Sequence, residues 1–140
     1  MRFDAHGLEI LSRDECLALL AGVPLGRVVF TDRALPAIQP VNFVLDGADV
    51  ILGTAAGSKL GVAMNGSIVA FEADEFDQAA RTGWSVTLVG PSRLVADPAE
   101  TARLALLPLQ PWAPGPRDRF VRIVGTHISG RRINAGDRVA

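Results

Sequence analysis

From Leu25 onward, the chain consists of short runs of β-branched and other apolar residues, with turn-forming residues about every eight to twelve positions. This spacing is typical of antiparallel sheets and barrels. It predicts strands at 26–31, 37–45, 49–53, 67–76, 84–96 and 119–129. The segments 32–36 and 46–48 have the composition of hairpin turns, so the strands that they join should be antiparallel. About six strands leave exposed edges in a flat sheet, and curling them into a small barrel removes those edges. We therefore expect a mainly β protein, a barrel of antiparallel strands with short flanking helices.

The flanking helices are predicted at 13–21, at 59–64 and between Asp97 and Pro108. Ser12 and Glu15 form a capping box, because each side chain can bond the backbone N–H of the other. Asp97 is a good N-cap, and the proline after it suits a first helical position. The segment 107–117 contains several prolines, so we expect it to be an ordered but irregular loop.

Length and composition limit the classes of protein to consider. The 140 residues, of which 49% are hydrophobic, fit one domain over 1–140 with its core at about 11–133. A net charge of −1 with scattered arginines offers no basic surface for nucleic acid. The sequence contains neither a membrane-length apolar run nor a secretory signal pattern, so we expect a cytoplasmic protein without a membrane segment. One cysteine, Cys16, and two distant histidines leave no metal site to expect, and Cys16 itself should be a small buried hydrophobe.

A possible phosphate site follows the predicted strand at 49–53. Thr54, Gly57, Ser58 and Lys59 lie where this strand turns into a helix, and backbone N–H groups are free at a helix start. The hydroxyls add donors, the glycine allows a tight turn, and Lys59 is the only lysine of the chain. The alternative is that Ser58 is a simple N-cap and Lys59 a solvated residue.

The order of the strongest segments resembles a known family. LGRVVF, LPAIQPVNFVLDGADVILGTAAGSKL, GSIVAFEADEFD, RTGWSVTLVGPSRLV and PLQPWAPGPRDRFVRI are similar to the pyridoxamine 5′-phosphate oxidase-like family of FMN-binding split β-barrels. The likeness covers about residues 11–133. It implies that Thr54, Ser58 and Lys59 hold the phosphate of FMN. It also implies a homodimer with the cofactor at the interface and an unidentified small-molecule substrate.

The same resemblance implies which residues lie beside the flavin ring, and these are Gln39, Pro40, Val41, Asn42, Trp84 and Ser85. Alternatives exist for several of them. Pro40 fits an edge strand without a ligand, Asn42 could bond backbone groups instead of a flavin, and Trp84 could belong to the core. Trp112 in the proline-rich loop suits either a contact over a planar ring or plain packing. The strand at 67–76 has acidic residues only near its end, so both faces of its first half should be covered, one by a partner subunit.

These expectations define a functional hypothesis, an FMN-binding oxidoreductase-type protein that transfers electrons or hydride at the flavin. The C-terminal tail retains only Arg131 and Arg132 of the family's substrate-phosphate elements, so oxidation of pyridoxamine phosphate is not expected. A deazaflavin-dependent reductase on the same fold is one alternative. Another is a non-catalytic flavin- or haem-binding module, in which His127 could serve as an axial ligand, whereas His6 should be solvated. No catalytic acid or base can be named.

Overall fold

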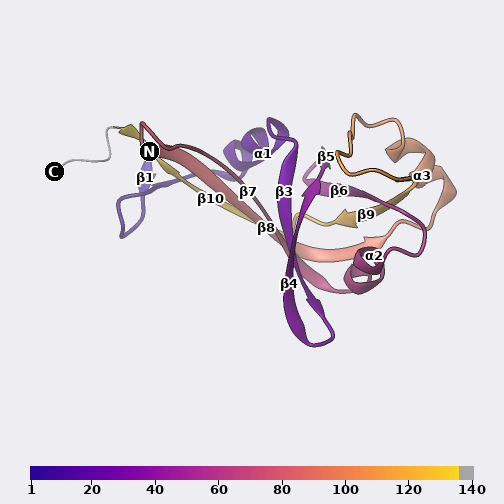
Figure 1. Ribbon diagram of the computed structural model, residues 1–140. Coiled ribbons are helices and arrows are strands. Elements are labelled where there is room, and N and C mark those ends of the chain that lie inside the picture. Colours follow the sequence, from indigo (N-terminus) through magenta and orange to yellow (C-terminus); the bar gives the residue numbers. More distant parts are fainter. Residues whose placement is uncertain (136–140) are drawn as a thin grey trace.

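The computed structural model describes residues 1–135 and confirms the mainly β architecture (Figure 1). The strands are β1 (Arg2–Phe3), β2 (Glu9–Ile10), β3 (Leu25–Asp32), β4 (Leu35–Asn42), β5 (Val44–Asp46), β6 (Asp49–Thr54), β7 (Ile68–Asp77), β8 (Thr82–Leu94), β9 (Arg119–Ile123) and β10 (His127–Ile133). The helices are α1 (Arg13–Ala21), α2 (Lys59–Met64) and α3 (Pro98–Leu104), at the predicted positions. Within residues 1–135, no helix is both long and apolar enough to cross a membrane. The cytoplasmic location stays a prediction.

The long strand β8 organises the barrel because its two ends pair with different neighbours. Its first part pairs with β7 and β10, and residues 92–94 pair with β9. From β8, one side of the sheet continues through β7, β3 and β4, and the other continues through β9, β6 and β5. β4 and β5 are consecutive in the chain, so the strands curl toward each other. Since β4 pairs with β3 whereas β5 pairs with β6, the ladder is interrupted there. The barrel is therefore split, as predicted, and does not close completely.

The predicted strand at 37–45 is wrong in one respect, because it forms two strands separated by Phe43. The backbone N–H of Phe43 donates to the carbonyl oxygen of Pro24 at 3.3 Å and leaves the ladder. Its side chain is 3% exposed and packs edge-on against Phe71, with ring centroids 4.6 Å apart. Burial of this aromatic ring is what bends the chain from β4 into β5.

The predicted strand at 119–129 is also divided, into β9 and β10. Between them the backbone N–H of Val124 donates to the carbonyl oxygen of Pro91. The backbone N–H of Thr126 donates to the carbonyl oxygen of Val124 and forms a tight turn. A Cβ atom on Gly125 would lie 2.0 Å from the carbonyl oxygen of Ala48, so only glycine fits this crossing. β9 and β10 therefore follow each other along one edge of β8, and β7 pairs with the other edge.

The N-terminal strands and the first hairpin were not predicted as they occur. β2 pairs with β1 and with the end of β10, which places the N-terminal segment beside residues 131–132 (Figure 1). β3 and β4 are joined by Arg33 and Ala34 alone, with φ values of 50° and 65°. These are the angles of a two-residue type I′ turn, so β4 begins earlier than expected.

The single chain covers one face of the strand at 67–76, and the predicted partner subunit on the other face stays a prediction. Val69, Phe71 and Ala73 point into the core, whereas Ile68 on the other face is 68% exposed. Ala70 and Glu72, on the same outward face, are half-buried.

A buried arginine ties the β5–β6 hairpin to α3. The side chain of Arg122 in β9 is 9% exposed and pairs with Asp46 at 2.7 Å, with Asp49 at 2.8 Å and with Glu100 at 2.9 Å. Arg103 also pairs with Asp46, and Arg93 also pairs with Glu100. We call these six residues the Arg122 cluster. Its three positive and three negative charges are balanced, which is the condition under which buried ions are tolerated.

Candidate functional site

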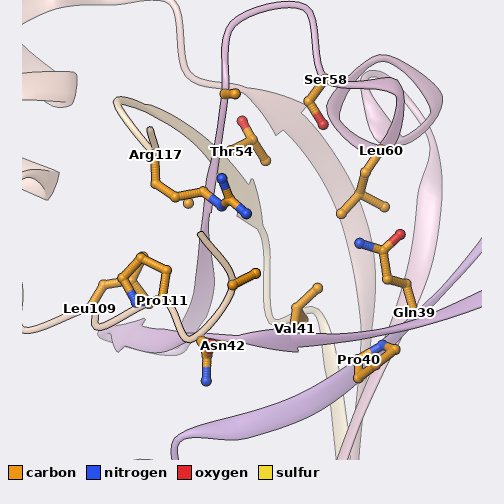
Figure 2. Close-up of a pocket in the computed structure, with 13 residues that line it drawn as sticks. Gln39, Pro40, Val41, Asn42, Thr54, Ser58, Leu60, Leu109, Pro111 and Arg117 are labelled. Atoms are coloured by element: carbon orange, nitrogen blue, oxygen red, sulfur yellow. The ribbon is translucent and has the colours of Figure 1, made fainter. Parts of the chain in front are cut away.

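A cavity of about 340 Å³ opens beside the end of β6, and we call it the Thr54 cavity (Figure 2). It is lined by Gln39, Pro40, Val41, Asn42, Gly53, Thr54, Ala55, Ser58, Leu60, Leu109, Pro111, Ala113 and Arg117. Its walls thus come from β4, from the turn between β6 and α2, and from the proline-rich loop. The structure brings together two groups of predicted site residues that are separated in the sequence.

Thr54 is the most informative residue of this cavity. It ends β6, is 4% exposed and points into the cavity (Figure 2). Its Oγ1 atom is the buried side-chain polar atom that lacks a hydrogen-bond partner within residues 1–135. An unpaired buried hydroxyl costs about 1–3 kcal/mol, so such a group is usually satisfied by a ligand, an ion or water. The cavity therefore contains an unused hydrogen-bonding position.

At the start of α2, Ser58 lines the Thr54 cavity whereas Lys59 does not. Ser58 is the N-cap, where its Oγ accepts from the backbone N–H of Gly61 at 3.3 Å, and its hydroxyl faces the Thr54 side of the cavity (Figure 2). Because a hydroxyl also has a proton to donate, capping leaves Ser58 able to bond a ligand. Lys59 is exposed and is not part of the lining. Gly57 is also outside the lining, and its φ of +74° shows that it serves the turn.

The predicted ring-binding residues of β4 all line the cavity. The amide of Gln39 points inward, and Pro40 and Val41 form the wall beside it (Figure 2). Asn42 finds backbone partners, which was the alternative to a flavin contact. Its Nδ2 donates to the carbonyl oxygen of Pro24 at 3.1 Å, and its Oδ1 accepts from the N–H of Trp112 at 2.8 Å. Asn42 therefore ties the proline-rich loop to the barrel.

The tryptophans and Ser85 lie outside the Thr54 cavity. Trp84 is 8% exposed and belongs to the main core, and Ser85 lies on the outward face of β8, opposite Asp74. Trp112 is 66% exposed and lines a neighbouring cavity together with Phe43 and Asn42. Within one chain, none of the three therefore contacts the same space as Thr54.

Arg117 is a cavity residue that the sequence did not indicate. Its guanidinium points toward Thr54 from the loop opposite (Figure 2). Within residues 1–135 its side chain has one hydrogen bond, to the carbonyl oxygen of Pro116, and no carboxylate partner. An arginine without a carboxylate partner beside the unpaired hydroxyl of Thr54 favours an anionic ligand. The signal available in the sequence was weak, since Arg117 is one of thirteen scattered arginines.

The other residues considered in the sequence analysis lie outside the Thr54 cavity. Arg131 pairs with Asp4 at 3.1 Å and Arg132 with Glu9 at 3.6 Å, at the far end of β10. His127 is exposed at the start of β10, and His6 is exposed near the N-terminus. In the described part of the chain, no group of three or more His, Cys, Asp or Glu residues is arranged to hold a metal ion.

Comparison with known proteins places these features in a family. The family model described as pyridoxamine 5′-phosphate oxidase matches residues 12–132. The chain is 44% identical over 133 residues to the uncharacterised protein Rv0080 of Mycobacterium tuberculosis, covering 91% of this chain and 87% of that one.

Solved structures show the same relationship. An FAD-binding protein from Mycobacterium smegmatis is 41% identical, with a TM-score of 0.75, and the match covers 88% of this chain and 95% of that one. A conserved protein of unknown function from Corynebacterium diphtheriae is 36% identical, with a TM-score of 0.75 and coverage of 89% and 97%. The split barrel and the near full-length matches agree, and this chain belongs to the pyridoxamine 5′-phosphate oxidase family.

Proposed function

We propose that the protein binds a flavin nucleotide in the Thr54 cavity and serves as a flavin-dependent oxidoreductase. The observation that carries the proposal is the buried Oγ1 of Thr54, which has no partner within residues 1–135 and faces the same space as Ser58 and Arg117. Two hydroxyl donors and one guanidinium match the needs of a phosphate group. The FAD-binding relative at 41% identity supports a flavin as the ligand.

The rest of the cavity suits the part of the ligand that carries the ring. The β4 segment and Leu60 supply mostly apolar walls with a few polar groups, which is the usual composition of a cofactor pocket. The volume of about 340 Å³ lies at the lower end of the range for small-molecule sites, so part of a flavin would extend to the cavity mouth. The FMN moiety is common to FMN and FAD, so this assignment holds for either cofactor.

In this function the protein mainly binds, orients and shields its cofactor. A bound flavin supplies electron or hydride transfer, and Thr54, Ser58 and Arg117 would fix its phosphate. The side chain of Gln39 would offer an amide to the polar edge of the ring. Pyridoxamine phosphate is not the proposed substrate, because Arg131 and Arg132 are paired with Asp4 and Glu9 and lie away from the cavity.

The variant Thr54→Val tests the assignment of the phosphate site. Valine has nearly the shape of threonine but no hydroxyl, so the protein without cofactor should be as stable as the wild type or slightly more stable. Flavin nucleotide affinity should fall by about 10- to 100-fold, the effect of one lost hydrogen bond to a charged group. Titration of flavin fluorescence and a thermal melt of the cofactor-free protein measure both quantities.

Thr31→Val at the exposed end of β3 is the matched control, and it should change neither quantity. Equal flavin affinity for wild type and Thr54→Val would contradict the phosphate assignment. The absorption spectrum and the mass of any cofactor released from purified protein identify it as FMN, FAD, a deazaflavin or haem. A deazaflavin or haem would replace the proposed flavin.

The homodimer is likewise proposed, with the outward face of the sheet as its interface. Ile38, Val29, Ala70 and Val89 are cross-strand neighbours and form one apolar row over β4, β3, β7 and β8. Ile38 and Ile68 are each 68% exposed on the single chain. A second copy on this face would cover the side of β7 that the sequence pattern predicts to be covered.

Ala70→Arg is expected to convert the dimer into a monomer, because it places a charge in the middle of the apolar row. Light scattering coupled to size-exclusion chromatography measures the mass in solution. Ala79→Arg in the exposed turn after β7 serves as control and should remain dimeric. A wild-type protein that is monomeric at micromolar concentration would disprove the proposed dimer.

A further inference from the structure

A second cavity adjoins the Thr54 cavity on the far side of the proline-rich loop. It has a volume of about 210 Å³ and is built from the end of α3, the start of β9 and the loop itself. Leu109, Pro111 and Arg117 line both cavities, so these three residues form the boundary between the two spaces. We call this space the α3 cavity.

The walls of the α3 cavity are mostly apolar, apart from Arg117 and Asp118. Leu104 and Phe120 form its floor, at 1% and 5% exposure, and belong to the second hydrophobic core cluster. Leu107 and Leu109 also line the cavity, and backbone hydrogen bonds hold both in place. The N–H of Leu107 donates to the carbonyl oxygen of Leu104 at 3.0 Å, and the N–H of Leu109 donates to the carbonyl oxygen of Leu107 at 2.8 Å. A preformed, mostly apolar cavity of this kind suits an aromatic group.

The residue at the junction indicates what a ligand spanning both cavities must carry. Arg117 lines both spaces and has no carboxylate partner within residues 1–135, whereas the arginines of the Arg122 cluster all do. The part of the ligand beside it should therefore be anionic. Asp118, an exposed carboxylate in the α3 cavity, can accept hydrogen bonds from hydroxyl or amino groups.

We propose that the α3 cavity binds the adenosine half of FAD, with the pyrophosphate of the cofactor beside Arg117. This rests on the proposed flavin site, which would hold the other half of the same molecule. The order of the three sites matches the order of the groups in FAD. Arg117 lies between the two cavities, and the anionic pyrophosphate lies between the two ring systems of the cofactor. The sizes also match, because the smaller cavity receives the purine and the larger one receives the end that carries the three-ring isoalloxazine.

The test compares the affinities for FAD and FMN in a variant that fills only the α3 cavity. Ala105 is exposed at the end of α3 and lines the α3 cavity but not the Thr54 cavity. Ala105→Phe should reduce the affinity for FAD by at least about tenfold and leave the affinity for FMN unchanged. Ala102→Phe, on an exposed part of the same helix outside the lining, is the matched control. Wild-type protein should bind FAD about tenfold or more tightly than FMN.

The outcomes separate this inference from the proposed function. Equal binding of FAD and FMN by wild type, or an unchanged FAD preference in Ala105→Phe, overturns the adenosine site and leaves the flavin site intact. Failure of the wild type to bind either cofactor overturns both. Adenosine alone should compete with FAD but not with FMN, which tests the cavity without any substitution, and competition with neither cofactor would also overturn the inference.

Discussion

Replacing Arg122 with leucine is expected to lower the free energy of unfolding by about 3 kcal/mol or more. The substitution leaves Asp46, Asp49 and Glu100 without the guanidinium that now bonds all three, and their side chains are only 17–24% exposed. Removing one partner of a buried ion pair is more damaging than removing both, because the remaining charge stays poorly hydrated. Chemical denaturation at neutral pH measures the loss.

The control for this prediction is Arg103→Leu. Arg103 also pairs with Asp46, at 2.8 Å, but its side chain is 54% exposed, so solvent screens the interaction and little stability should be lost. If the Arg122 and Arg103 variants unfold at the same denaturant concentration, the burial of Arg122 is not the cause. The comparison uses the same acidic partner for both arginines.

The pH dependence of stability gives a second measurement on the Arg122 variant. Hydrogen bonds from Arg103 and Arg122 hold the pKa of Asp46 well below its usual 3.8, and those from Arg93 and Arg122 lower the pKa of Glu100 from 4.5. Because these pKa values are lower in the folded state, the stabilisation is complete above the unfolded values and is lost as the pH falls below them. Wild type should therefore lose stability below about pH 4.5, and Arg122→Leu should lose less over the same range.

Arg117→Gln is expected to weaken the binding of flavin nucleotides by about 10- to 100-fold. A hydrogen bond between charged groups contributes about 1.5–3 kcal/mol, and each 1.4 kcal/mol corresponds to a factor of ten. Riboflavin, which has no phosphate, should bind the variant and the wild type equally. The ratio of nucleotide to riboflavin affinity, measured by fluorescence titration, therefore isolates the phosphate contact from any change in the ring site.

Two further substitutions make this test specific to position. Arg119→Gln removes an exposed arginine two residues away, outside the cavity lining, and should change nothing. Lys59→Gln tests the cation that the sequence indicates, but Lys59 is exposed and outside the lining, so its effect should be small. A larger loss for Lys59→Gln than for Arg117→Gln would place the phosphate on the outer side of the β6–α2 turn.

The parts of the site that could be predicted are those encoded by neighbouring residues. Thr54 and Ser58 lie within five residues at a strand-to-helix turn, and the family likeness adds Gln39 to Asn42 on one strand. Arg117 could not be predicted in this way, because it reaches the cavity through the path of a loop without regular structure. Lys59, next to Ser58 in the sequence, lies outside the cavity lining, because a helix start sends adjacent side chains in different directions.

In the fold, too, features encoded by short sequence patterns were predicted, whereas features that depend on contacts between distant residues were not. The helix caps and the Asp46–Gly47 turn follow from short patterns, and both occur as predicted. The break at Phe43 depends on a core contact with Phe71, and the break at Gly125 depends on the backbone of Ala48. The turn predicted at 32–36 is confined to Arg33 and Ala34, and its two-residue form was not predicted because neither residue is typical of positive φ.

The pairing of β2 with β10 also determines when folding can finish. Glu9 and Ile10 pair with Arg132 and Arg131, so the last ladder of the sheet joins segments from opposite ends of the chain. β3 and β7 likewise pair across a long intervening stretch, and such sequence-distant pairs form slowly because long loops must close first. A ribosome must therefore release nearly the whole chain before the sheet is complete, and until then the edge of β8 that β10 will cover is available to other chains.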